Sequence, residues 1–248
     1  MKYANYVFLL LCFLCLGQTR AEVRSGLSYA SPDIQALQLD LFRNPGSLWL
    51  EEGKKLFSDC TACHQDMQKM RGVILRYPKL STTSNQHTRQ LQTLEARIWQ
   101  CQSEHLQQKP WATESKELLA VTTYIAHASL GLPIERELSA SEKPFWLAGK
   151  GLYFTRLGQL NLACTHCHDQ LAGKRLLGQT ISQGQSNGYP TYRLEWNGIG
   201  SLARRIRACF QGVRAEPPPA DSAEMANLIL YMQTRSSGLR VETPAVRR

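Results

Sequence analysis

One short motif occurs twice in the sequence, and this repeat limits what the chain can fold into. The motif is C-x-x-C-H, written CTACH at residues 60–64 and CTHCH at residues 164–168. It is the attachment signature of c-type haem, in which two thiols bond to one porphyrin and the adjacent histidine turns onto the iron. The spacing therefore predicts two covalently bound c-type haems, one for each motif.

The residues that bind the haems follow from the motif. His64 and His168 are the predicted iron ligands. A zinc ribbon and a thioredoxin-like redox motif are alternatives for the C-x-x-C pairs. Zinc would not require a histidine after both pairs, and neither pair follows the strand of a βαβ unit, so haem is favoured. The predicted attachment thiols are Cys60, Cys63, Cys164 and Cys167.

The first 21 residues have the layout of a secretory signal peptide. A lysine is followed by an apolar run over residues 6–16 and by a polar segment that ends at Ala21. Export places the rest of the chain in an oxidising compartment, which we predict to be the periplasm. No later window holds a long uncharged apolar run, so no membrane span is expected.

The chain is basic. Its formal net charge is +9, which falls to +7 once Lys2 and Arg20 are removed with the signal peptide. Such a charge favours anionic partners, either a small anion or an acidic protein, through electrostatic steering. Nucleic acid is not expected as a partner in an exported compartment.

The two halves of the chain resemble each other well beyond the haem motif. Each half has a glycine-containing segment before the motif, a segment that ends in cysteine after it, and a closing apolar segment. Alignment of several landmarks in one order indicates internal duplication. The matched segments are GKKLF (53–57) with GKGLYF (149–154), ARIWQC with ARRIRAC, and LLAVTTYIAHASLGL (118–132) with MANLILYMQTRSSGL (225–239).

The periodicity of each half is mainly helical. Residues 117–130 and 223–235 each place their apolar side chains on one helical face. The pattern resembles class I cytochrome c, in which a glycine of the first helix lets the last helix pack close beside it. Gly53 and Gly149 would be these glycines. The apolar positions are Leu118, Val121, Ile125 and Ala128 in the first half and Met225, Leu228, Ile229 and Met232 in the second.

We therefore predict a mainly α fold of two tandem class I cytochrome c-like domains related by duplication. The polar segment at 133–144 is bounded by prolines and separates the repeats. It places the N-terminal domain at 22–138 and the C-terminal domain at 139–248. Residues 170–200 are rich in glycine and polar side chains, and are expected to form a long loop around the second haem.

Neither half offers a methionine for the far side of its iron. Met67 and Met70 are too close to His64 to reach across a haem, while Met225 and Met232 belong to the packing face of the last helix. The sixth ligand must therefore come from another residue type.

The two remaining thiols, Cys101 and Cys209, are the favoured sixth ligands. They occupy matching places, each about forty residues after its own proximal histidine. Thiolate ligation would lower the haem potentials because anionic sulfur stabilises ferric iron. A disulfide between the two cysteines is an alternative in an oxidising compartment. His87, His105 or water are the other candidates.

Cys209 differs from Cys101 in the charge around it. Four arginines stand near Cys209 in the sequence: Arg204, Arg205, Arg207 and Arg214. Arginine lowers the pKa of a thiol and binds oxyanions through paired hydrogen bonds. A solvated face or binding of haem propionates is the alternative role. In a helix, Arg205 and Cys209 would share a face, as would Arg207 and Arg214, so Arg205 is the predicted substrate-binding residue.

On these residues the chain resembles SoxA, the dihaem cytochrome subunit of the thiosulfate-oxidising Sox system. The paired motifs, RIRACFQGVRAEPPP (205–219) and GYPTYRLEW (188–196) carry the resemblance, which covers essentially the whole mature chain. It implies that Cys209 is the active-site cysteine, carried as a persulfide, and that Arg205 binds the substrate. It also implies the iron ligands, His64 with Cys101 for the first haem and His168 with Cys209 for the second.

The resemblance further implies an activity, that of an L-cysteine S-thiosulfotransferase. Such an enzyme joins thiosulfate oxidatively to a cysteine of the carrier protein SoxYZ and passes two electrons to a cytochrome c acceptor. It works as a heterodimer with a small cytochrome c subunit, SoxX. A non-catalytic dihaem electron-transfer cytochrome is the chief alternative, but it does not explain the arginines around Cys209. A dihaem peroxidase would need an open iron.

Overall fold

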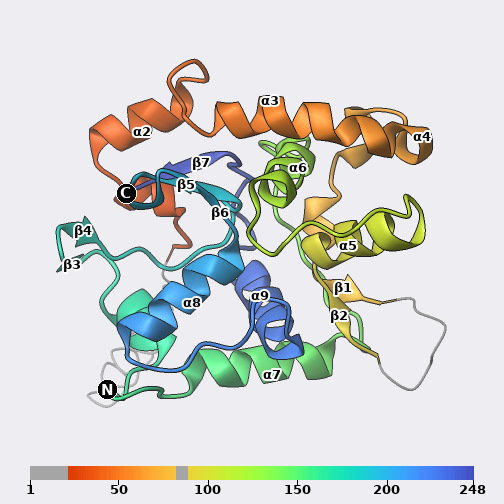
Figure 1. Ribbon diagram of the computed structural model, residues 1–248. Helices are drawn as coiled ribbons and strands as arrows, with labels where there is room; N and C mark the ends of the chain where they lie inside the picture. The colour runs from red at the N-terminus through yellow and green to blue at the C-terminus, as the bar shows by residue number, and fades with distance from the viewer. Residues whose placement is uncertain (1–21, 82–88) are drawn as a thin grey trace, which may run out of the picture.

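The computed structural model describes residues 22–81 and 89–248, which are mainly helical (Figure 1). The predicted signal peptide and His87 lie outside the described residues. Short 3₁₀ or π segments are labelled η. The elements of the first half are η2 (Gly26–Tyr29), α2 (Pro32–Leu39), α3 (Ser47–Leu56), η3 (Phe57–Cys60), α4 (Thr61–His64), η4 (Met67–Met70), η5 (Ile74–Arg76), β1 (Lys79–Leu80), β2 (Leu91–Gln92), α5 (Leu94–Glu104) and α6 (Lys116–His127).

The second half repeats the helical order of the first and contains more strands. Its helical elements are α7 (Lys143–Phe154), η6 (His166–Gln170), η7 (Leu194–Trp196), α8 (Leu202–Gly212) and α9 (Ala223–Arg235). Its strands are β3 (Arg175–Leu176), β4 (Gln179–Thr180), β5 (Thr191–Arg193), β6 (Gly198–Gly200) and β7 (Ala245–Arg247).

A glycine lies at each of the two main helix crossings. Helix α3 packs on α6, and α7 packs on α9. A Cβ on Gly53 would lie 2.2 Å from the carbonyl oxygen of Ala120, and a Cβ on Gly149 would lie 2.0 Å from that of Asn227. Only glycine permits backbones to approach this closely. The predicted packing of first helix on last helix is confirmed in both halves.

Hydrophobic clusters form around each crossing. The first contains Leu118, Val121 and Ile125 of α6, and the second contains Met225 and Leu228 of α9. These residues belong to the apolar faces predicted from periodicity, so the mainly α, duplicated architecture is confirmed. The domain boundary between residues 138 and 139 stays a prediction.

Matching caps start the matching helices. Thr93 begins α5 and Ser201 begins α8, and each side-chain oxygen accepts a hydrogen bond from a backbone N–H of the first turn. Both caps stand eight residues before a cysteine, Cys101 or Cys209. The same local signal therefore fixes the register in which each helix presents its thiol.

The expectation of a long loop at residues 170–200 is only partly correct, because residues 181–190 form no helix or strand and contact His168, whereas the rest of the segment contains strands. This segment contains the hairpin β3–β4 and the strands β5 and β6, which pair antiparallel with each other. Strand β7 pairs parallel with β5, with Thr191 opposite Ala245. All three residues of β5 are buried, so the strand shows no polar alternation. Its partner lies about fifty residues away in sequence, and local periodicity cannot reveal it.

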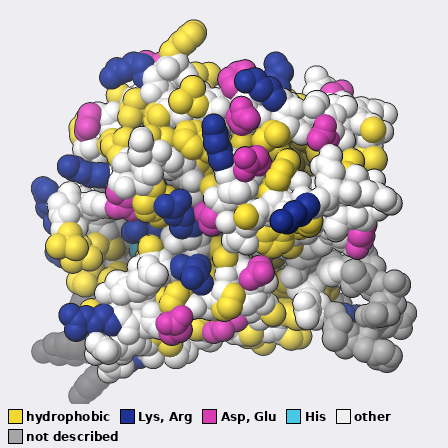
Figure 2. All heavy atoms as spheres, viewed as in Figure 1, with side chains coloured by type: hydrophobic (Ala, Val, Ile, Leu, Met, Phe, Trp, Pro, Cys, Tyr) yellow, Lys and Arg dark blue, Asp and Glu magenta, His cyan; other side chains and the backbone are white. Residues whose placement is uncertain are grey.

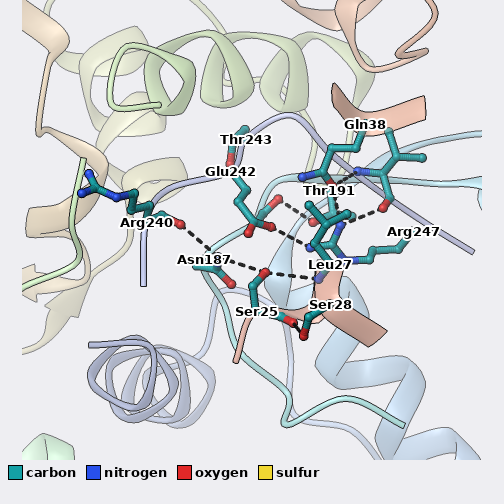
Figure 3. Close-up of polar contacts among 12 residues, drawn as sticks. Ser25, Leu27, Ser28, Gln38, Asn187, Thr191, Arg240, Glu242, Thr243 and Arg247 are labelled. Carbon is teal, nitrogen blue, oxygen red and sulfur yellow. Dashed lines mark hydrogen bonds and ion pairs between the residues drawn. The ribbon is translucent and has the colours of Figure 1, made fainter. Parts of the chain in front are cut away.

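A polar network joins the two ends of the described chain to the segment before β5 (Figure 3). The side-chain amide of Asn187 donates to the carbonyl oxygen of Arg240 at 2.9 Å, and the backbone N–H of Glu242 donates to the carbonyl oxygen of Asn187 at 3.0 Å. Arg247 pairs with Glu242 at 2.9 Å and also donates to Gln38. The network anchors the chain that leads from η6 to β5.

The surface carries charges of both signs. Figure 2 shows Lys and Arg side chains interspersed with Asp and Glu on the face that it draws, rather than gathered in one basic patch. Among the residues that the structure describes, no helix has the length and apolar character needed to cross a bilayer.

Candidate functional site

Helix α8 supplies two of the predicted site residues, Arg205 and Cys209. Its apolar residues Ala203, Ile206 and Phe210 are buried in the second core cluster. Arg205 and Cys209 are one turn apart and only partly buried by the protein. The prediction that residues 203–209 are helical is confirmed, and the side chains of Arg205 and Cys209 interact.

His168, in η6, lies close to Cys209. The two side chains interact with each other. The Nδ1 of His168 lies 2.8 Å from the carbonyl oxygen of Ser182, which can only accept, so Nδ1 carries the hydrogen. This leaves Nε2 of His168 as the nitrogen that faces Cys209. Such a backbone contact fixes the tautomer of a metal-binding histidine.

The charges around Cys209 favour its thiolate. Burial alone would raise its pKa, but the interaction with His168 and the positive charges of Arg205 and Arg193 outweigh burial, and the pKa of Cys209 is lowered. For His168, burial alone would lower the pKa, but the interaction with Cys209 and the Ser182 carbonyl raise it. In the absence of a metal, the pair therefore favours a protonated imidazole facing a thiolate.

The thiols of the second motif lie at the same site. Burial raises the pKa of Cys164 to about 11, and the charge of Cys209 adds to the effect. Burial and, to a smaller extent, the charge of Cys209 also raise the pKa of Cys167. Two thiols, a histidine whose Nε2 is not held by the backbone and a cysteine beside it form a donor set that suits a c-type haem. The residues of the second site therefore fit this group.

The first motif brings together a similar set of side chains, which is more exposed to solvent. Burial raises the pKa of Cys60 to about 11, and the charges of Cys101 and, more weakly, Cys63 contribute. Helix α5 thus brings Cys101 to the first motif, as α8 brings Cys209 to the second. His64 is exposed at the end of α4, and its pairing with Cys101 stays a prediction.

The structure bears on three of the alternatives. Cys101 and Cys209 are both free thiols and lie beside different motifs, which disfavours a disulfide between them. Among the described residues, no three His, Cys, Asp or Glu side chains gather as a zinc ribbon would require. His105 is exposed just after α5 ends.

The four arginines near Cys209 do not act together. Arg204 lies over the ring of Trp196, with 4.3 Å from Cζ to the ring centroid, and Arg207 donates to the carbonyl oxygen of Pro218 at 2.6 Å. Both line a groove of about 810 Å³. The predicted shared face of Arg207 and Arg214 is wrong, because α8 ends at Gly212 and Arg214 is exposed with a φ of 58°. Only Arg205 of the four interacts with Cys209.

Three residues that sequence reasoning did not assign lie at the site: Tyr189, Arg193 and Glu195. Arg193 is 4% exposed, and its Nε donates to Oε1 of Glu195 at 2.7 Å. The same Oε1 lies 3.7 Å from Nη1 of Arg205. Tyr189 interacts with Arg205, Arg193 and Cys209, and burial raises its pKa. All three belong to the GYPTYRLEW stretch, which was the available signal in the sequence.

Comparison with known proteins identifies the family to which the chain belongs. The family model for the SoxA/TsdA cytochrome c domain matches residues 46–134 and 148–241, which is most of the chain and includes both motifs. The chain belongs to the SoxA/TsdA cytochrome c family. The two matched stretches of this family model each contain one first-to-last helix crossing, so the duplicated fold and the family assignment agree.

Individual SoxA proteins are similar over nearly the whole chain. The L-cysteine S-thiosulfotransferase subunit SoxA of Pseudaminobacter salicylatoxidans is 38% identical over 236 residues, which cover 91% of this chain and 81% of that protein. The same subunit of Rhodovulum sulfidophilum is 32% identical, with 91% and 80% covered. The crystal structure of SoxXA from P. pantotrophus superposes with a TM-score of 0.86 at 30% identity, covering 91% of this chain and 87% of that one. The resemblance to SoxA proteins is confirmed.

Proposed function

We propose that this chain is the SoxA-type subunit of an L-cysteine S-thiosulfotransferase. It conjugates thiosulfate to a cysteine of a carrier protein. The observation that supports this most directly is that Cys209 interacts with both His168 and the Arg205 guanidinium, which lies one turn before it on α8. A pure electron carrier would need the histidine and the thiol but would have no use for an anion-binding arginine beside them.

We propose that the chain holds two haems. Cys60, Cys63, His64 and Cys101 would hold the first, and Cys164, Cys167, His168 and Cys209 would hold the second. When bound, the second haem supplies a one-electron acceptor beside the Cys209 sulfur. The Ser182 carbonyl holds the Nδ1 hydrogen of His168, which would leave Nε2 to bind the iron.

Thiosulfate would enter as an anion and meet Arg205. A guanidinium binds a sulfonate through two parallel N–H donors, which fixes the orientation of the anion. The terminal sulfur of thiosulfate then forms an S–S bond with the Cys209 thiolate. This step releases two electrons and leaves Cys209 bearing an S–SO₃⁻ group. Arg205 would offset the repulsion between the two anions during the approach.

The carrier cysteine completes the cycle. Its thiolate attacks the sulfur bonded to Cys209, forms the S-thiosulfonate of the carrier, and releases the Cys209 thiolate. The whole reaction removes two electrons and one proton from thiosulfate and a thiol. A small SoxX-type cytochrome c would form the heterodimer with this chain, a SoxYZ-type protein would be the carrier, and a cytochrome c would accept the electrons.

The compartment and the organisation of the chain complete the proposal. Residues 1–21 would act as a cleaved signal peptide that delivers the chain to the periplasm. Residues 22–138 and 139–248 would form the two haem domains. We further propose that Cys209 of the second domain is carried as a persulfide; its outer sulfur then takes the part of the thiolate sulfur in both steps, and the persulfide is restored at the end of each cycle.

The test compares the Cys209→Ala variant with the wild type in two assays. We expect thiosulfate-dependent reduction of the acceptor, in the presence of carrier, to fall at least a hundredfold in the variant. We expect the chemically reduced variant still to pass electrons to the same acceptor, since Cys164 and Cys167 keep the haem attached. The Cys101→Ala variant is the matched control, because it removes a thiol from the other site. Normal thiosulfate turnover by Cys209→Ala would reject the proposal and favour the electron-carrier alternative.

A further inference from the structure

Arg193 is a buried arginine with an unsatisfied hydrogen-bond donor. Its side chain is 5% exposed, and its Nε donates to Glu195. Its Nη2 is buried and has no hydrogen-bond partner among the described residues. A buried guanidinium N–H without an acceptor is costly, and such groups usually have a ligand or a water. The position therefore suggests that an anion completes its contacts.

The unpaired nitrogen belongs to the site of Cys209. The carboxylate oxygen Oε1 of Glu195 lies 2.7 Å from Nε of Arg193 and 3.7 Å from Nη1 of Arg205. The two guanidiniums therefore converge on the carboxylate of Glu195. The positive charges of both also act on the Cys209 sulfur. Arg205 is one-third exposed whereas Arg193 is enclosed, so the pair reaches from solvent into the protein.

Rigid contacts hold Arg193 in place. It ends strand β5, whose backbone pairs with β6 on one side and β7 on the other. Its Cζ lies 5.2 Å from the centroid of the Trp196 ring, and Glu195 holds the Nε edge. An arginine fixed by a sheet, an aromatic ring and a carboxylate loses little entropy when it binds an anion.

We propose that Arg193 is a second thiosulfate-binding residue, which together with Arg205 holds the sulfonate group and directs the terminal sulfur at Cys209. The inference rests on the proposed function and deepens it. Two positive charges bind a dianion better than one, and two guanidinium planes restrict its orientation more than one does. Glu195 orients both arginines and partly neutralises them while no anion is bound.

The chain offers a matched control in Arg204. Both Arg193 and Arg204 contact the Trp196 ring, but Arg204 lines the separate groove with Arg207. Loss of either arginine removes one positive charge and one cation–π contact. Only the loss of Arg193 should remove a direct contact with thiosulfate.

The experiment measures thiosulfate binding by isothermal titration calorimetry. The full chain is loaded with haem, kept reduced so that oxidative coupling cannot proceed, and studied without carrier or acceptor. We expect Arg193→Gln to raise the Kd for thiosulfate at least tenfold and Arg204→Gln to change it less than twofold. In turnover assays the KM should rise in Arg193→Gln more than kcat falls, while the haem absorption spectrum stays that of the wild type.

Three further outcomes are possible, and each has a defined consequence for the inference. If Arg193→Gln does not fold, Arg193→Lys keeps the buried charge but loses the two-pronged donor, and its Kd should still rise at least threefold. Wild-type affinity in either folded variant overturns this inference while leaving the proposed function intact. If the wild type itself neither binds nor turns over thiosulfate, the proposed function fails together with the inference.

Discussion

Gly184 packs directly against the imidazole ring of His168. A Cβ at position 184 would lie 2.9 Å from both Cγ and Nδ1 of that ring. Two residues earlier, the carbonyl oxygen of Ser182 accepts the hydrogen bond of Nδ1 at 2.8 Å. The segment 182–184 therefore determines both the tautomer and the plane of the histidine that we propose to ligate the second haem.

Replacing Gly184 with alanine should displace the His168 ring. The new methyl group cannot fit beside the imidazole, and the backbone φ of 68° adds strain for any residue with a side chain. We expect altered g-values of the second haem in electron paramagnetic resonance spectra and a lower thermal midpoint. Gly178→Ala is the matched control, because φ is 80° there and nothing lies within 4 Å of the added Cβ. Identical spectra for the two variants would contradict this account of His168.

Two glycines of α7 should respond to alanine in opposite directions. At Gly149 the added Cβ would lie 2.0 Å from the carbonyl oxygen of Asn227, so the α7–α9 crossing must open, at a cost of about 3 kcal/mol in the free energy of unfolding. At Gly151, nothing lies within 4 Å, and alanine should stabilise the helix by about 0.5 kcal/mol. Denaturant unfolding of both variants checks this. Equal stability would show that the close crossing does not matter.

Arg205 should contribute to turnover, whereas Arg214 should not. Loss of a charge-assisted hydrogen bond to an anion costs about 1.5–3 kcal/mol, which corresponds to a reduction in kcat/KM of about 10–150-fold for Arg205→Gln. Arg214→Gln removes the same charge from an exposed position beyond the end of α8. Steady-state kinetics with thiosulfate as the varied substrate distinguishes them, and equal effects would mean that only overall charge matters.

Glu95 should make the stability of the first half depend on pH. Burial raises its pKa above the ordinary value of 4.5, partly opposed by hydrogen bonds from its own backbone and from Thr93. The folded state therefore binds the proton more tightly than the unfolded state. The stabilisation this gives is present below pH 4.5 and is lost as the pH rises through the raised pKa. Glu95→Gln should raise the thermal midpoint at neutral pH but not at pH 4. An unchanged midpoint at neutral pH would contradict the burial of this carboxylate.

Local chemistry made much of the fold predictable from the sequence. The haem motifs, the helix periodicities and the glycines at the crossings are short-range signals, and Gly53 and Gly149 lie where the resemblance between the halves placed them. The placement of Cys101 and Cys209 beside their own motifs followed from the same internal alignment.

The three-stranded sheet β6–β5–β7 and the position of Arg193 could not be predicted from local sequence patterns. Arg193 reaches the Cys209 site because β5 pairs with β7, a segment about fifty residues away, and no local pattern encodes that pairing. Arg207 and Arg214 were wrongly placed on one face because a seven-residue spacing assumes a continuous helix, whereas Gly212 ends α8 between them.

The central claim is that Cys209 handles sulfur, and peptide mass mapping tests it most directly. The protein is purified from a haem-loading periplasm, incubated with thiosulfate, and digested before and after treatment with a thiol reductant. We predict extra, reductant-labile sulfur on the peptide that contains Cys209 and none on the peptide that contains Cys101. An unmodified Cys209 peptide, or equal modification of both cysteines, would contradict the account.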